Sequence, residues 1–138
     1  MTELNQKNMY HKVLVVDDNE IDRYIAARNI KAYHFADEIV AKESAMSAIE
    51  YLDSLKDTPE DLPQIIFLDI RMPEMDGFGF LQEYAKLSAS IQKNCIILML
   101  STSLDPTDHE RAKKNPFVKK FLNKPLDKDS LNGVTPKE

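Results

Sequence analysis

The sequence predicts an α/β protein, a doubly wound five-stranded parallel sheet with helices on both faces. Short apolar runs recur along the chain, and most are apolar on both faces, which is typical of strands covered by helices. Segments with helical spacing lie between these runs. The 138 residues suffice for one domain with a substantial core and are too few for two, and no repeat or linker divides them.

The strands are predicted from short runs rich in β-branched or aromatic residues. Four runs are clear and a fifth is weaker. In chain order they are 13–16, the weaker 39–41, 65–68, 95–100, and the broken pair 117–118 with 121–122. Their alternation with helical segments is the element order of a doubly wound sheet.

The first two helices are predicted from apolar spacing. One is expected over about 20–31, with Ile21, Ile25 and Arg28 on one side. The next is expected over about 44–55, where a serine at the first position is a suitable N-cap and an apolar stripe follows.

The remaining helices are predicted from spacing and from terminal signals. A third is expected over about 77–88. Asp105 as N-cap, followed by a proline in the first helical position, predicts a fourth helix over 106–114, which Pro116 ends. A brief helical turn is expected at 127–131.

The composition excludes several classes of protein. Lys and Arg number 18 against 23 Asp and Glu, a net charge of −5, which argues against general binding to nucleic acids or to anionic membranes. A single cysteine, Cys95, excludes an internal disulfide framework and fits a reducing compartment. No apolar run approaches the roughly 20 residues that cross a bilayer, and the polar start does not resemble a secretory signal. We therefore expect a cytoplasmic protein.

Polar residues with chemical potential stand where the predicted strands end. Asp17 and Asp18 follow the first strand, Asp69 the third, Ser101 the fourth and Lys124 the fifth. Ligands of doubly wound sheets bind at these carboxyl ends. Three carboxylates there repel one another unless a cation neutralises them, and an oxygen-only donor set suits Mg²⁺, or Mn²⁺, better than zinc. A carboxylate beside Mg²⁺, with a lysine and a hydroxyl opposite, is typical of an aspartate that accepts a phosphoryl group.

Four segments carry a resemblance to a known family. They are Asp17-Asp18 after VLVV, LDIRMPEMDG from Leu68 to Gly77, LMLSTS from Leu98 to Ser103, and FLNKP from Phe121 to Pro125. Their order and spacing resemble the signature segments of the receiver domain of two-component response regulators. The resemblance implies the strand order 2-1-3-4-5. Each segment alone is weak evidence, because acidic pairs and Lys-Pro are common in turns, but the four together favour a phosphoacceptor.

The resemblance also implies which residues hold the metal and the phosphoryl group. Asp69 is the expected phosphoacceptor. Asp18 is expected to bind Mg²⁺ directly, Asp17 mainly through water, and Arg71 through its backbone carbonyl. The side chains of Arg71 and Ser103, each two positions after a signature residue, are expected to influence the lifetime of the phosphoryl group.

A second group of residues is implied to sense the phosphoryl group. Lys124 is expected to pair with a phosphoryl oxygen, and the Lys124–Pro125 peptide bond is expected to be cis. Ser101 is the expected switch hydroxyl, which turns toward the phosphoryl group. Phe121 is the expected switch aromatic residue, which turns inward when the hydroxyl moves.

The implied function is that of a single-domain response regulator, not of an enzyme beyond its own phosphorylation and dephosphorylation. A histidine kinase or a histidine phosphotransfer protein donates the phosphoryl group to Asp69, and binding to an unidentified downstream protein changes. Two alternatives remain: a phosphorelay intermediate that passes the group to another histidine, and a phosphorylation-independent scaffold. A phosphatase of the haloacid-dehalogenase type is disfavoured, because Arg71 stands where that family needs a second acid.

The expected receiver domain covers 11–131, with a polar extension at 1–10 and a tail at 132–138. Its last helix is shorter than is usual in the family. The dimer surface that the family builds with this helix is therefore in question.

Basic residues gather late in the chain. Residues 111–128 hold seven Lys or Arg and a single acid, Asp127. A solvated face is the favoured interpretation. The alternative hypothesis is a surface that meets an acidic partner protein after activation.

Overall fold

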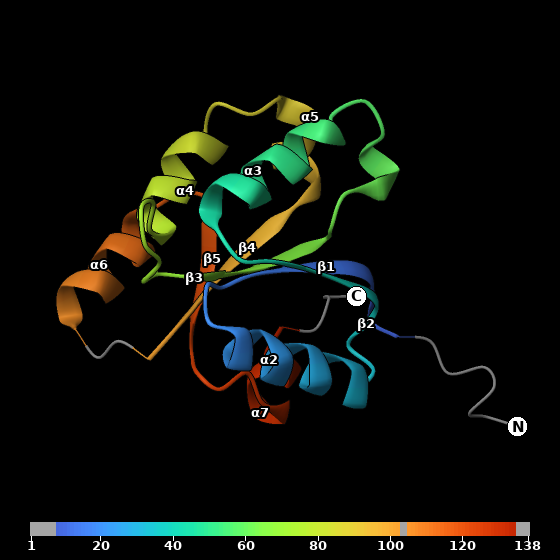
Figure 1. The fold of residues 1–138 in the computed structure, drawn as a ribbon, viewed down its shortest axis with the longest axis vertical. Helices are drawn as coiled ribbons and strands as arrows, with labels where there is room; N and C mark the ends of the chain where they lie inside the picture. The colour runs from blue at the N-terminus through green and yellow to red at the C-terminus, as the bar shows by residue number, and fades with distance from the viewer. Residues whose placement is uncertain (1–7, 103–104, 135–138) are drawn as a thin grey trace, which may run out of the picture.

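The computed structural model describes residues 8–102 and 105–134. Five parallel strands form one sheet in the order β2-β1-β3-β4-β5, which confirms the predicted fold class and strand order (Figure 1). The strands are β1 Tyr10–Val16, β2 Ala36–Lys42, β3 Ile65–Asp69, β4 Ile96–Ser101 and β5 Val118–Asn123.

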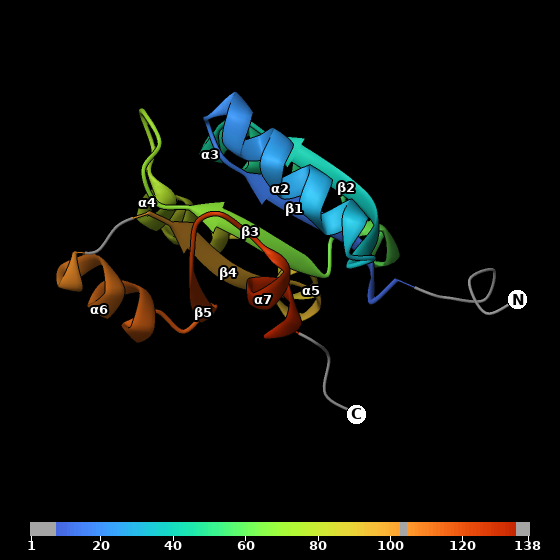
Figure 2. The same cartoon turned by 90° about the horizontal axis from the view of Figure 1, so that it is seen from below.

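Helices cover both faces of this sheet. They are α2 Glu20–Ala32, α3 Ala45–Ser54, the 3₁₀ turn η1 Pro59–Asp61, α4 Gly77–Tyr84, α5 Ala89–Asn94, α6 Pro106–Lys114 and α7 Lys128–Asn132. Figures 1 and 2 show α2 and α7 on one face and α3, α4 and α5 on the other, with α6 beside the edge strand β5. No helix within the described ranges is both long and apolar enough to cross a membrane.

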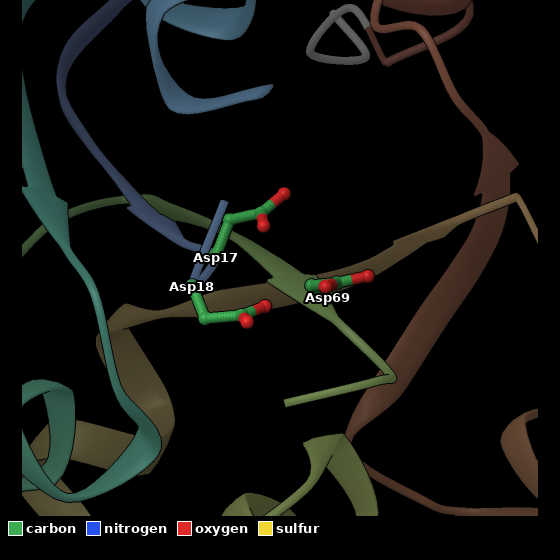
Figure 3. A group of neighbouring side chains, drawn as sticks. All are labelled: Asp17, Asp18 and Asp69. Carbon is green, nitrogen blue, oxygen red and sulfur yellow. The ribbon is translucent and has the colours of Figure 1, made fainter. Parts of the chain in front are cut away.

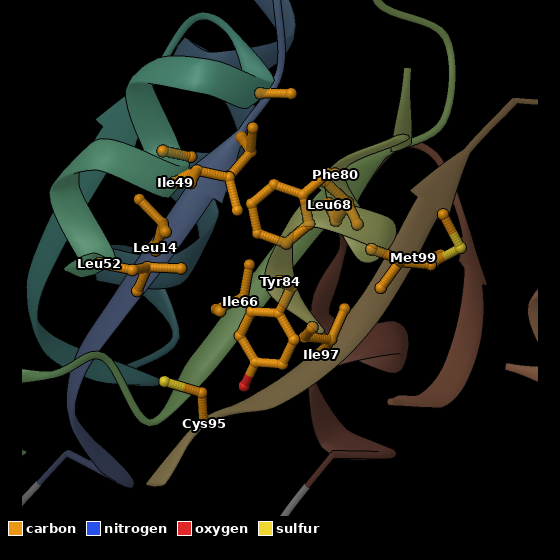
Figure 4. Close-up of a cluster of buried hydrophobic side chains, with 14 of the residues drawn as sticks. Leu14, Ile49, Leu52, Ile66, Leu68, Phe80, Tyr84, Cys95, Ile97 and Met99 are labelled. Carbon is orange, nitrogen blue, oxygen red and sulfur yellow. The ribbon is translucent and has the colours of Figure 1, made fainter. Parts of the chain in front are cut away.

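Two apolar clusters, one on each face, form the core. Because successive strand residues point to opposite faces, Leu14 packs with Phe80 of α4 in one cluster (Figure 4), whereas Val15 packs with Ile30 of α2 and Leu131 of α7 in the other. Burial on both faces explains why β1, β3 and β4 appear in the sequence as continuous apolar runs.

The strand that was weakest in the sequence is complete in the structure. β2 covers seven residues although most of its side chains are exposed or half-buried, because it pairs with β1 from Tyr10↔Ala36 to Val16↔Lys42. This pairing also explains why β1 starts at Tyr10, ahead of its apolar run. Main-chain hydrogen bonds, which hydrophobic periodicity does not report, define this edge of the sheet.

The side of the first helix that the sequence singled out is not its buried side, since only Ile25 of its three residues is even half-buried. Ile21 is 68% exposed, and Arg28 is exposed as well, whereas Ala26 and Ile30 are the buried residues of α2. Apolar residues occur on more than one side of this helix, so spacing alone allows two faces. Packing selects the face with alanine, since a small side chain lets the helix approach the sheet closely.

The predicted helix over 77–88 is too long, and α5 was not predicted. α4 ends at Tyr84, and a turn leads into α5. The side-chain amide of Gln92 donates to the carbonyl oxygens of Tyr84, Ala85 and Leu87 at 3.1–3.2 Å. The Tyr84 carbonyl also accepts from the backbone N–H of Leu87 at 3.0 Å. Because carbonyl groups at a helix end have no partner in a further turn, the Gln92 amide stabilises the break.

Terminal signals predicted the other helices well. Asp105 accepts a hydrogen bond from the backbone N–H of Thr107 and starts α6, which ends at Lys114 as expected. Ser44 caps α3 in the same way. The helical turn expected after β5 is α7. Just after this helix, the carbonyl oxygen of Val134 accepts a hydrogen bond of 2.7 Å from the Tyr10 hydroxyl.

Candidate functional site

Three carboxylates meet at the carboxyl ends of two neighbouring strands (Figure 3). Asp17 and Asp18 follow β1, and Asp69 is the last residue of β3, which pairs with β1. One oxygen from each of the three lies within 4.8 Å of the others. Asp17 and Asp69 are buried, and Asp18 is exposed. The structure therefore brings together the three aspartates that the sequence singled out.

Asp17 is held by the start of α2 and by β2. Its Oδ1 accepts from the backbone N–H of Asn19 at 3.0 Å, and its backbone carbonyl accepts from Arg23 Nη1 at 2.8 Å. Its own N–H donates to the carbonyl oxygen of Lys42 at 3.1 Å. Asn19 also caps α2, accepting from the N–H of Asp22. These contacts leave the second carboxylate oxygen of Asp17 facing the site.

Lys124 reaches the carboxylates from the end of β5. Its Nζ lies 2.8 Å from Asp17 Oδ2, 2.8 Å from Asp22 Oδ2 and 3.4 Å from Asp69 Oδ1, and its side chain is 11% exposed. Burial alone lowers the pKa of Lys124, but the hydrogen bonds to Asp17 and Asp22 and the charge of Asp69 outweigh burial and raise it. The ammonium group therefore stays charged.

The electrostatics of the site centre on Asp69. Burial, reinforced by the negative charge of Asp17, raises the pKa of Asp69 to about 6. Lys124 lowers the pKa but does not cancel these effects, and Asp18 raises it further. One ammonium group thus leaves negative charge uncompensated, and a divalent cation among these oxygens would neutralise it.

Ser101 and the Lys124–Pro125 bond shape the opposite side of the site. Ser101 is buried at the end of β4, and its carbonyl oxygen accepts from the backbone N–H of Lys124 at 3.0 Å. The Lys124–Pro125 peptide bond is cis, as expected. The hydrogen bond to Ser101 holds the backbone of Lys124 at the end of β4, and its side chain reaches Asp69 at the end of β3.

The remaining predicted site residues lie toward α6. The Arg71 side chain is exposed and forms an ion pair with Asp108 of α6. Phe121 of β5 is half-buried, and its ring stacks on that of His109, with the ring centroids 4.0 Å apart. Ser103 lies outside the described residues.

The loop between β3 and α4 passes very close to the strand end. A Cβ atom at Gly77 would lie 2.6 Å from the backbone oxygen of Asp69, so only glycine fits without displacement of the backbone. The Gly77 N–H donates to the Ile70 carbonyl at 2.8 Å, and Asp76 caps α4 by accepting from the N–H of Gly79. This close approach accounts for the glycine at the end of the LDIRMPEMDG segment.

The family profile described as "Response regulator receiver domain" matches residues 13–134. This chain belongs to that family. Members of this family are signalling domains of two-component systems. The fold and the acidic cluster of this chain are those expected of a receiver domain.

Two solved receiver structures show how far the likeness extends. A two-component response regulator from Cytophaga hutchinsonii superposes with a TM-score of 0.84 at 30% identity, covering 93% of this chain and 94% of the other. The receiver domain of the histidine kinase CKI1 from Arabidopsis thaliana, crystallised with Mg²⁺ and BeF₃⁻, superposes with a TM-score of 0.73 at 27% identity, covering 87% of this chain and 85% of the other.

Curated relatives of this chain include both short and long proteins. The probable methanogenesis regulatory protein FilR2 of Methanothrix harundinacea is 29% identical over 119 residues, which are 86% of this chain and 75% of FilR2. The chain spans 14% of the sensor histidine kinase CheAY of Helicobacter pylori. Receiver domains thus occur within longer signalling proteins as well.

The sequence did not reveal two contributors to this receiver site. Asp22 binds Lys124, and Asp108 binds Arg71. An acid in the first turn after the Asp17-Asp18 pair was a signal for Asp22. No local signal marked Asp108, since the two members of its ion pair are 37 residues apart.

Proposed function

We propose that this receiver domain accepts a phosphoryl group on Asp69 from a histidine kinase or a histidine phosphotransfer protein, and signals through changed binding of a downstream protein. The position of the Asp69 carboxylate carries the proposal. It is buried at the end of β3, 3.4 Å from the Lys124 ammonium group and within reach of the cation that Asp17 and Asp18 could share. A cytoplasmic location is part of the proposal.

The proposed reaction depends on Mg²⁺. The cluster of three carboxylate oxygens fits a hard divalent cation, and Mn²⁺ accepts the same donors. Asp18, Asp17, Asp69 and the backbone carbonyl of Arg71 are the proposed ligands; the Arg71 side chain is engaged with Asp108. The bound ion supplies neutralisation of negative charge on the phosphoryl oxygens.

The residues of the chain have distinct parts in the transfer. An oxygen of Asp69 forms a bond to phosphorus while the phosphorus–nitrogen bond of the donor phosphohistidine breaks, and the electron pair remains on the imidazole. Lys124 donates to one phosphoryl oxygen and the Ser101 hydroxyl to another. Water later attacks phosphorus, releases phosphate and restores the Asp69 carboxylate. The domain catalyses only these reactions of its own side chain.

The proposed output passes through Ser101 and Phe121 on the neighbouring strands β4 and β5. When the Ser101 hydroxyl moves toward the phosphoryl group, the Phe121 ring turns inward and leaves its stack on His109. That change alters the surface of α6 and β5 and shifts the population toward a partner-binding state.

The basic residues of 111–128, most of them on α6 and β5, suggest the charge of a partner. Six of the seven are exposed; these are Arg111, Lys113, Lys114, Lys119, Lys120 and Lys128. A solvated face explains them with fewer assumptions, and an acidic partner protein is the sharper hypothesis. Reversing the charge of both Lys113 and Lys114 should release a phosphorylation-dependent partner. If every such partner stays bound, the hypothesis of an acidic partner fails.

Intact mass after incubation with a phosphodonor tests the function. The wild type should gain one phosphoryl group from acetyl phosphate or from a phosphohistidine protein, and chelation of Mg²⁺ should abolish the gain. Asp69→Asn should gain none, whereas the matched control Asp57→Asn, an exposed aspartate outside the site, should behave as wild type. Rapid loss of the group to a second histidine protein would indicate a relay intermediate. No adduct from either donor would leave the scaffold alternative.

A further inference from the structure

Lys124 is bound by a carboxylate outside the acidic cluster and the proposed phosphoryl-transfer chemistry. Asp22, in the first turn of α2, places Oδ2 2.8 Å from Lys124 Nζ. Asp17 is equally close, whereas the proposed phosphoacceptor Asp69 is more distant, at 3.4 Å. The ammonium group therefore rests closer to two other acids than to the carboxylate whose phosphoryl group it is proposed to bind.

The two close carboxylates differ in how firmly they are held. Asp17 is buried, and its other oxygen accepts from the N–H of Asn19. The Asp22 side chain is 37% exposed, and Lys124 is its one ion-pair partner among the described residues. Water can therefore replace Lys124 as the partner of the Asp22 carboxylate. If Asp17 lost Lys124, its carboxylate would be left as a buried charge without its partner.

The structure leaves room for this exchange. A pocket of about 200 Å³ adjoins the ion pair, lined by Asp22 and Lys124 together with Ile25, Leu100, Thr102 and Leu126. Side-chain rotation there does not require repacking of the core. The separation of Lys124 from Asp22 thus costs mainly the charge-assisted hydrogen bond between them.

We propose that Asp22 is a positioning residue that competes with the phosphoryl group for Lys124 and so lowers the affinity of the site for that group. A phosphoryl group brings up to about two negative charges next to Asp69, and Lys124 shifts toward it at the expense of the Asp22 contact. The inference rests on the proposed phosphoacceptor function and adds a residue that sets how favourable phosphorylation is.

Beryllium fluoride, which forms BeF₃⁻ and resembles a bound phosphoryl group, is the ligand for the test. Its binding at fixed Mg²⁺ is followed by ¹⁹F NMR for the wild type and for Asp22→Ala. Loss of the competing carboxylate should lower the half-saturating concentration by about threefold to tenfold. A conservative second variant, Asp22→Asn, should change it in the same direction.

A matched variant separates competition from a general charge effect. Glu20→Ala removes one negative charge from the same turn of α2, where Glu20 is exposed and lies outside the ion pairs of Lys124. It should change the half-saturating concentration by less than about twofold. The NMR signal of the Lys124 ammonium group should shift in Asp22→Ala and stay in place in Glu20→Ala, which checks the contact without any ligand.

Three results overturn the inference. The first is that Asp22→Ala matches Glu20→Ala, the second is that Asp22→Ala binds BeF₃⁻ more weakly than wild type, and the third is that the wild type binds none. The first two, with a wild type that binds BeF₃⁻ and gains a phosphoryl group, leave the proposed function intact. The third, together with no adduct by mass, removes the proposed function as well.

Discussion

Arg71 and Asp108 form an ion pair that joins the loop after Asp69 to α6. The Arg71 side chain is 62% exposed, whereas that of Asp108 is 6% exposed. A carboxylate buried to this degree needs charge-assisted hydrogen bonds to offset its lost hydration. The pair therefore stabilises α6 in its place beside the site, from the loop that also carries the proposed phosphoacceptor.

Removal of this arginine should destabilise the fold. Arg71→Ala takes a charged partner from a buried carboxylate, which costs about 2 kcal/mol of the free energy of unfolding. Urea unfolding at neutral pH measures the change. Arg28→Ala is the matched control, because Arg28 is exposed and outside the ion pairs of the described residues; it should cost less than about 0.5 kcal/mol. Equal costs for the two variants would argue that the ion pair contributes nothing.

Gly77→Ala should destabilise the receiver because of the close approach at the end of β3. The new Cβ atom would lie 2.6 Å from the Asp69 backbone oxygen and 2.9 Å from Met99 Cε. Relief of such a contact moves the loop or the strand, at a cost of about 1–3 kcal/mol.

Gly79→Ala provides the comparison for this variant. Its Cβ would lie 2.7 Å from Met75 Cγ, a side-chain atom that moves by rotation about the Met75 Cα–Cβ bond without displacement of the backbone. Alanine also favours the helix by about 1 kcal/mol relative to glycine. Gly79→Ala should therefore be close to neutral by urea unfolding. A larger loss of stability in Gly79→Ala than in Gly77→Ala would contradict the geometric account.

The raised pKa of Asp69 predicts a pH-dependent cost to stability in Mg²⁺-free buffer. Because this pKa is about 6 in the folded protein and 3.8 ordinarily, the folded state binds the proton more tightly than the unfolded state. The cost is therefore fully present above pH 6 and fades as the pH falls toward 4. It amounts to about 2–3 kcal/mol.

Asp69→Asn should remove this cost. The variant should exceed wild type in free energy of unfolding by about 2 kcal/mol at pH 7.5, and the two should converge near pH 4. Urea titrations in EDTA across this range provide the measurement. A difference in free energy of unfolding that stays constant with pH would show that burial and the neighbouring charges do not raise the pKa of Asp69.

Mg²⁺ should stabilise the folded protein, because the acidic cluster exists only there. For a dissociation constant of about 1 mM, 10 mM Mg²⁺ adds roughly 1.4 kcal/mol, or about 4 °C in Tm. Asp18→Ala should abolish most of this response, since Asp18 is a proposed direct ligand. Differential scanning calorimetry with and without Mg²⁺ measures it.

The control for the metal response is a distant carboxylate. Asp57→Ala removes an exposed aspartate between α3 and η1 and should leave the rise in Tm unchanged. The same rise in Asp18→Ala as in wild type would place the bound ion elsewhere.

Local signals predicted most of the site. Asp69 and Ser101 end their strands, and Asp17 and Lys124 directly follow theirs, so the end of a strand locates each of them in the sequence. Parallel strands then bring these ends to one edge of the sheet. Local signals did not predict which side of α2 faces the sheet. Apolar residues occur on two sides of this helix, and packing against the sheet selects one of them.

The class of fold, the places of the acidic residues and of Lys124 at strand ends, and the family could all be predicted from neighbouring residues, because strand periodicity and short motifs are local properties of the chain. The contacts of Asp22 with Lys124 and of Arg71 with Asp108 could be found only in the folded chain. Those partners are 102 and 37 residues apart along the chain. These contacts depend on where α2 and α6 pack against the sheet. Packing between segments that are distant in the sequence determines those positions.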